Sequence, residues 1–190
     1  MGIVNATPDS FYEGSRRPQA QAAIDQALRM AEEGADWIDI GGQSTRPGSD
    51  GVSLDEELRR VLPVLEGLSG RLRLPVSIDT DKSQVALRAR QAGAAILNDV
   101  SALRNDPAMM EQAKSFELVV LMHMGGKTPK TMQESPRYED VVAEVKDFLK
   151  ERRAAFARAG GDASRILFDP GIGFGKTFQH PFGARHYDLF

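Results

Sequence analysis

Short apolar runs that end at polar residues recur along the whole chain. The first run, residues 1–5, breaks into a Thr-Pro-Asp-Ser turn, which is typical of a buried strand followed by a loop. Five later runs predict strands at 37–40 (WIDI), 76–79 (VSID), 95–99 (AILND), 118–124 (LVVLMHM) and 166–169 (ILFD). Polar residues therefore gather where successive strands end, which is the arrangement of an α/β enzyme site.

Apolar residues at helical spacing separate these strands. The spacing predicts helices over about 20–31, 53–65, 82–92, 106–116 and 138–160. Ser53 and Glu56 form a capping box at the start of the second helix, and Pro63 predicts a kink or an early end of it. Glu57 is interpreted as part of a solvated face of this helix.

Strands that alternate with helices predict a parallel α/β fold. The pattern leaves two architectures open, a doubly wound open sheet and a closed (β/α)8 barrel of the TIM type. A complete barrel typically needs roughly 250 residues, whereas this chain has 190. The pattern therefore predicts either an open sheet or an incomplete barrel with about six βα units.

The amino-acid composition indicates which partners and which cellular compartment to expect for this protein. With a formal net charge of -3 and 27% charged residues, the chain gives no reason to expect nucleic acid or a membrane as a partner. The absence of cysteine excludes disulfides and thiolate chemistry and fits a cytoplasmic location. Neither a basic and apolar leader nor an apolar run of about 18 residues occurs, so neither secretion nor a membrane span is expected.

Three strand-end residues, Asp79, Asn98 and Asp169, form a set suited to a nitrogen-rich heterocycle. Carboxylates accept hydrogen bonds from ring N–H and amino groups, and an amide both donates and accepts. The alternative is that each side chain caps the helix that follows, which is the commoner role for one Asp at a strand end. Convergence of all three at one barrel mouth would favour ligand binding.

Two glycine-rich loops and one histidine allow a chemical and a structural interpretation. The loops at 41–48 (GGQSTRPG) and 170–176 (PGIGFGK) could approach a phosphate closely, but surface turns have the same composition. The second loop fits neither the Walker A spacing nor the dinucleotide fingerprint. His123 lies in an apolar strand, which favours packing over a ligand or base role. His180 and His186 have no carboxylate or cysteine pattern around them and predict no metal site.

Six motifs together resemble the dihydropteroate synthase family. They occur in the family's order and spacing, and they cover residues 1 to about 177: GIVNATPDSF, DIGGQSTRPG, VSIDT, ILNDVSAL, LMHM followed by KTMQ, and DPGIGFGKT. The resemblance implies a (β/α)8 barrel. It also implies a transferase that joins 4-aminobenzoate to 6-hydroxymethyl-7,8-dihydropterin diphosphate and releases diphosphate, in folate biosynthesis.

The resemblance also implies roles for individual residues. Asp79, Asn98 and Asp169 would hold the pterin, with Asp79 and Asp169 stabilising the cationic intermediate. Asn5 would bind the diphosphate-bound Mg²⁺. The remaining substrate-binding residues implied by the motifs are Val100, Met122 or Met124, and Phe174 around the pterin, and Thr45, Arg46, Pro47 and Phe11 around the diphosphate and aminobenzoate.

The family pattern continues beyond 177 with a Ser-Arg-Lys motif and an Arg-x-His motif that this sequence lacks. We therefore expect a truncated or frame-altered member, with a partial barrel domain at 1–177 and a tail without the family pattern at 178–190. The family's dimer contacts come from late helices, so dimerisation is not carried over from the resemblance and the oligomeric state stays open. Two alternatives stay open: a non-catalytic pterin-binding fragment, and a relative of the methyltetrahydrofolate-binding methyltransferases.

Overall fold

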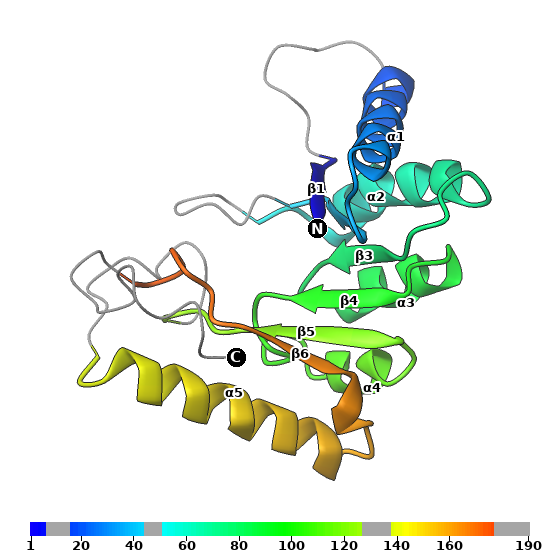
Figure 1. Cartoon of the computed structure of the whole chain (residues 1–190). Helices are drawn as coiled ribbons and strands as arrows, with labels where there is room; N and C mark the ends of the chain where they lie inside the picture. The colour runs from blue at the N-terminus through cyan, green and yellow to red at the C-terminus, as the bar shows by residue number, and fades with distance from the viewer. Residues whose placement is uncertain (7–15, 44–50, 127–137, 177–190) are drawn as a thin grey trace.

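The strands of this chain form one parallel sheet in sequential order. The computed structural model describes residues 1–6, 16–43, 51–126 and 138–176 (Figure 1). Within these ranges the order is β1-β2-β3-β4-β5-β6, every neighbouring pair being parallel. The bounds are β1 (Gly2–Asn5), β2 (Ile38–Gly41), β3 (Val76–Asp79), β4 (Ile96–Asp99), β5 (Leu118–Met122) and β6 (Ile166–Asp169). A doubly wound sheet reverses its strand order at a switch point, whereas a TIM-type barrel does not. The fold is therefore of the (β/α)8 type, with five βα units and a sixth strand in the described residues.

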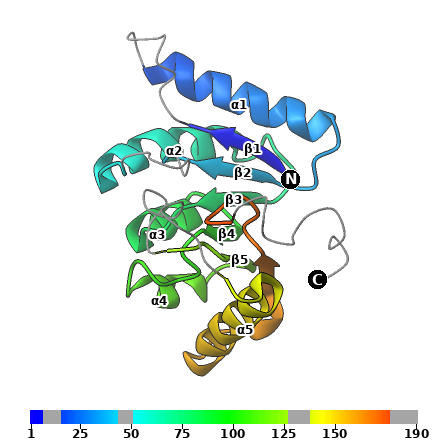
Figure 2. The same ribbon diagram turned by 90° about the vertical axis from the view of Figure 1, so that its left-hand side faces the viewer.

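The helices lie along the outer side of the curved row of strands (Figure 2). Their bounds are α1 (Arg16–Glu32), α2 (Leu54–Leu68), α3 (Ser83–Gln91), α4 (Met109–Ala113) and α5 (Val141–Arg158), with a short 3-10 helix η1 (Ala163–Arg165) before β6. In the part of the chain that the structure describes, no helix combines the length and the apolar character of a membrane span.

The two faces of the sheet differ in chemistry because side chains alternate along each strand. The face toward the helices carries the apolar core, and its central strand residues are fully buried: Val4, Ile38, Ile40, Ile78, Leu97, Val119 and Leu121. The opposite, inner face holds Asn5, Asp39, Ser77, Asp79, Asn98 and Asp169. The alternation thus concentrates polar side chains on one face.

Helix α2 differs from its prediction at Pro63. The capping interaction is present, with the Ser53 hydroxyl accepting from the Glu56 N–H at 3.2 Å. The expected early end at Pro63 is wrong, because the helix continues to Leu68. Pro63 is exposed, so solvent can satisfy the carbonyl of Arg59, which has lost its helical partner.

Glu57 is buried, which contradicts its interpretation as part of a solvated face. Its side chain is 0% exposed. One carboxylate oxygen accepts from the Thr80 hydroxyl at 2.6 Å and the other from Lys82 Nζ at 2.6 Å. Lys82 Nζ also donates to the Gln43 amide oxygen at 2.7 Å. This network ties α2 to the segment that follows β3, and a buried carboxylate is tolerated there because it is paired.

We predict that Glu57→Ala lowers the free energy of unfolding by about 2 kcal/mol in urea titrations. Removing one member of a buried ion pair costs about 3–5 kcal/mol, and the partial solvent access of Lys82 reduces that cost. Glu66, exposed on the same helix, supplies the control Glu66→Ala, with an expected change within about 0.5 kcal/mol. Equal stability of the two variants would contradict a structural role for the Glu57 network.

Candidate functional site

The predicted polar residues meet on the inner face of the sheet at its carboxyl end. Asn5 pairs in register with Gly41, Gly41 with Asp79, and Asp79 with Asn98. A Cβ on Gly41 would lie 3.5 Å from Asp79 Oδ2 and 3.8 Å from Asn5 Oδ1, so both oxygens border the space left by the missing side chain. Asp169 lies farther along the same edge, opposite Met122. Four strands therefore deliver these groups to one edge.

The Asp79 carboxyl group lies in an environment that disfavours its charged form. Burial raises its pKa well above the ordinary value of 3.8, and the negative charges of Asp39, Asp99, Glu57 and Asp81 raise it further. Among the described residues, no hydrogen-bond donor reaches its oxygens. Asp79 therefore does not cap the helix that follows, and its oxygens are available to a ligand that brings donors or positive charge.

Asp39 belongs to the same polar face, although sequence reasoning assigned it no role. Its side chain is 3% exposed, and its Oδ2 accepts from the Asn98 amide at 3.1 Å. Its other oxygen has no partner among the described residues. Burial raises the pKa of Asp39, while Ser77 and Asn98 partly offset the shift. The alternation of strand 37–40 was the available signal, since it places Asp39 opposite Ile38 and Ile40.

An apolar cluster stands beside these polar groups. Val100, Met122 and Met124 are buried against one another, with Phe174 packed on them, separately from the main core. The family resemblance implied Val100, Met122 or Met124, and Phe174 as residues that line the pterin pocket, and the structure brings all four together. The site thus combines hydrogen-bonding groups with an apolar wall, as expected for a flat heterocyclic ligand.

Asp169 has a structural contact as well as its place in the site. Its Oδ1 accepts from the Gly171 N–H at 2.7 Å, forming a turn at the start of the loop after β6. Within the described residues no helix follows β6, so this bond makes a turn and not the helix cap that was the alternative.

His123 packs rather than facing the site. Its ring meets Phe148 edge-on at 5.0 Å between centroids and lies 6.1 Å from Tyr138. Burial lowers its pKa to about 4, with smaller contributions from Lys176 and Arg104. A neutral packed imidazole agrees with the packing interpretation, although its Nδ1 has no partner within the described residues.

Asn5 offers one oxygen ligand for a cation. The side chain is exposed at the end of β1 and borders the space above Gly41. The described residues contain no cluster of three His, Cys, Asp or Glu side chains that could hold a metal ion. Mg²⁺ commonly takes one or two protein oxygens and completes its shell with phosphate and water. A single amide oxygen therefore fits a phosphate-bound Mg²⁺ better than a metal held by the protein alone.

Several predicted residues lie outside the described ranges: Phe11, Thr45, Arg46, Pro47, His180 and His186. The flanks of segment 44–50 are described. The Gln43 amide oxygen accepts from the Val52 N–H at 3.3 Å and from Lys82 Nζ at 2.7 Å. These bonds join the two ends of the segment beside β3.

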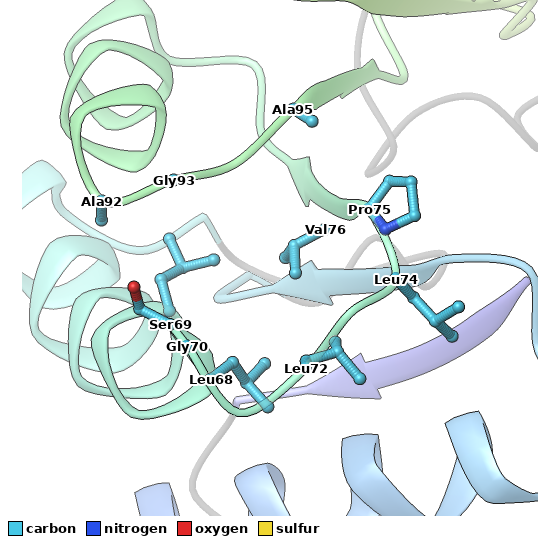
Figure 3. Close-up of a pocket in the computed structure, with 11 residues that line it drawn as sticks. Leu68, Ser69, Gly70, Leu72, Leu74, Pro75, Val76, Ala92, Gly93 and Ala95 are labelled. Atoms are coloured by element: carbon cyan, nitrogen blue, oxygen red, sulfur yellow. The ribbon is translucent and has the colours of Figure 1, made fainter.

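A pocket of about 180 Å³ lies at the opposite, amino-terminal end of the strands (Figure 3). Leu65, Leu68, Leu72 and Leu74 line it, between the ends of α2 and α3. None of the predicted site residues reaches it. In barrels of this type the carboxyl end carries the chemistry and the amino end contributes to stability, so this pocket is separate from the candidate site.

Comparison with known proteins agrees with this arrangement. The pterin binding enzyme family matches residues 1–186. The dihydropteroate synthase of Escherichia coli is 44% identical over 180 residues, which cover 95% of this chain and 64% of that protein. The chain thus spans about 64% of the length of this curated relative.

Solved structures give the same match in three dimensions. A Xanthomonas albilineans dihydropteroate synthase with 4-aminobenzoic acid aligns with a TM-score of 0.83 and 51% identity, over 93% of this chain and 62% of that one. A Burkholderia cenocepacia dihydropteroate synthase complexed with 7,8-dihydropteroate aligns with a TM-score of 0.80 and 46% identity, over 93% and 59%. With the parallel barrel order and the motifs in place, this chain belongs to the pterin binding enzyme family.

Proposed function

We propose that this protein acts as a dihydropteroate synthase, joining 4-aminobenzoate to 6-hydroxymethyl-7,8-dihydropterin diphosphate with release of diphosphate. The observation that carries the proposal is the Asp79 carboxyl group, whose raised pKa and lack of a described donor suit a donor-rich ring. Relatives that bear this name and align over most of the chain support it.

The pterin ring matches the site group by group. Its amino group and ring N–H groups are donors for the oxygens of Asp79 and Asp169, and the Asn98 amide can donate to or accept from the ring. The flat bicyclic face suits the apolar wall of Met122 and Phe174. Hydrogen bonds to the charged form of Asp79 would restore the stabilisation that its burial removes.

The reaction exchanges one bond at the pterin methylene carbon. The C–O bond to diphosphate breaks, the amino nitrogen of 4-aminobenzoate forms the new C–N bond, and that nitrogen loses a proton. Positive charge develops on the methylene-pterin as diphosphate leaves. Asp79 and Asp169 would stabilise this charge from the inner face, and the protein would otherwise hold the two substrates in line and away from water.

Magnesium is a second part of the proposal. Asn5 Oδ1 would contribute one ligand to a Mg²⁺ that also binds the diphosphate. When bound, this ion would neutralise the charge that builds up on the leaving group. We further propose a cytoplasmic location, which the absence of cysteine fits.

Pterin binding and product formation can be measured separately on this chain. We predict that the parent chain binds 6-hydroxymethylpterin in calorimetry and forms dihydropteroate from the two substrates. Asp79→Asn should weaken pterin binding roughly a hundredfold, because hydrogen bonds to a charged group contribute up to about 3 kcal/mol.

The exposed Asp36 supplies a matched control, and Asp36→Asn should bind pterin as the parent does. Binding without product would support the alternative of a non-catalytic pterin-binding fragment. Unchanged binding by Asp79→Asn would show that the site is assigned to the wrong residues.

We predict that the same Asp79→Asn substitution stabilises the ligand-free fold at neutral pH. A carboxyl group whose pKa is raised on folding binds its proton more tightly in the folded chain, so folding becomes less favourable as pH rises from 3.8 through the raised pKa. An amide removes this cost. The midpoint of thermal unfolding should therefore exceed that of the parent at pH 7, and the difference should shrink toward pH 4. A midpoint below that of the parent at pH 7 would contradict this electrostatic assignment.

The metal assignment predicts a selective effect of Asn5→Ala. Mg²⁺ should tighten binding of the pterin diphosphate to the parent. In the variant, the factor by which Mg²⁺ increases the affinity should be roughly tenfold smaller, a difference of about 1.4 kcal/mol. Binding of 6-hydroxymethylpterin, which carries no diphosphate, should not change. Asn105→Ala is the control, since Asn105 lies in the loop between β4 and α4 and donates its amide to the Asp81 carboxylate. A full Mg²⁺ effect in Asn5→Ala would remove Asn5 from the metal site.

A further inference from the structure

Lys176 is a buried cation whose donors are directed to the protein's own backbone. Its side chain is 8% exposed. Nζ donates to the carbonyl oxygens of His123 at 2.8 Å, Gly171 at 2.8 Å and Phe174 at 3.2 Å. An ammonium group has three N–H donors and no acceptor, so the three carbonyls match its full capacity.

These bonds connect two strand ends of the candidate site. His123 follows β5 and lies between Met122 and Met124, whereas Gly171 and Phe174 belong to the loop after β6. The contact between the two segments is close, because a Cβ on Gly171 would lie 2.0 Å from the His123 oxygen, and Gly171 has a φ of +62°. Only glycine fits here.

Other bonds hold the same loop. The Gly125 N–H donates to the Phe174 oxygen at 3.1 Å, and the Tyr138 hydroxyl donates to the Gly175 oxygen at 3.0 Å. The loop starts at Asp169, whose carboxylate accepts from the Gly171 N–H. Lys176 lies at the centre of this set, since it bonds to both sides of the junction.

We propose that Lys176 is a positioning residue for the pterin pocket. Its ammonium group holds Phe174 against Val100, Met122 and Met124, and it holds the turn that orients Asp169. Deprotonation leaves two N–H donors for three carbonyl oxygens, which loosens the junction. This role rests on the proposed pterin-binding function of the site.

The surroundings of Lys176 place the loss of its proton within a range of pH that binding experiments can cover. Burial lowers the pKa of Lys176 to about 7, and the Asp169 carboxylate opposes the shift. His123, whose pKa is lowered to about 4, is neutral above pH 6. Burial also raises the pKa of Tyr138 above 10.0, so its hydroxyl keeps its proton. Among these neighbours, Lys176 is the group whose pKa falls between pH 6 and 9.

The test measures binding of 6-hydroxymethylpterin by calorimetry from pH 6 to 9. We expect Lys176→Met to bind 6-hydroxymethylpterin about tenfold more weakly than the parent at pH 6, which corresponds to about 1.4 kcal/mol of binding free energy. The parent should lose affinity as pH rises, and the variant should lack that step. Lys150→Met, at an exposed lysine on α5, is the control and should keep the parent's affinity and pH profile, including any titration of the pterin itself.

Each outcome separates this role from the proposed function. A parent chain that binds no pterin overturns the function. A parent that binds, together with a Lys176→Met chain of equal affinity and profile, overturns only the role of Lys176. A purely structural lysine would lower affinity equally at every pH and leave the parent's profile in place, which also overturns it.

A second measurement needs no variant, in case Lys176→Met does not fold. By linkage, a ligand that binds more tightly when Lys176 is protonated must raise the pKa of Lys176 when it binds. In the parent, the lysine Nζ resonance that titrates near pH 7 should therefore shift to higher pH when 6-hydroxymethylpterin is added. An unchanged midpoint would overturn the proposal.

Discussion

The constraint on which the structure depends is the two-residue alternation along its parallel strands. Helices cover one face of the sheet, so the strand residues on that face are predominantly apolar and buried, as Ile40 and Leu121 are. The residues between them must then lie on the inner face. Because the strands pair in register from β1 to β4, Asn5, Asp79 and Asn98 reach the same edge together. The site follows from the same geometry that builds the core.

Two acids, one fully buried and one partly buried, show how this chain separates structure from function. Glu57 is fully buried, but Thr80 and Lys82 satisfy both of its oxygens. Asp79 has no such partner in the described residues, and further acids surround it, so its pKa is raised. A paired charge holds elements together, whereas an unpaired one is costly to the fold and available to a ligand. The unpaired acid stands at the candidate site.

The loop after β6 shows a similar division of roles. Its composition, PGIGFGK, invites comparison with phosphate-binding loops. In the structure, Lys176 bonds to three carbonyl oxygens of the protein, and Gly171 allows the backbone to approach His123. The glycines and the lysine thus join β5 to β6. The side chain of Phe174 and the second carboxylate oxygen of Asp169 remain for a ligand.

The sequence by itself determined the strand ends, the helix spacing, the family motifs and the polar set of Asp79, Asn98 and Asp169, because these signals arise within a few residues. Only the tertiary structure decided the sequential strand order, the burial of Glu57, the hydrogen bond between Asp39 and Asn98, and the backbone contacts of Lys176. Each depends on a partner far away in the chain: Glu57 and Thr80 are 23 residues apart, Lys176 and His123 53, and Asp39 and Asn98 59. Local sequence patterns predict which face of a strand or helix a residue lies on. Its hydrogen-bond partner depends on which distant segments the fold brings together.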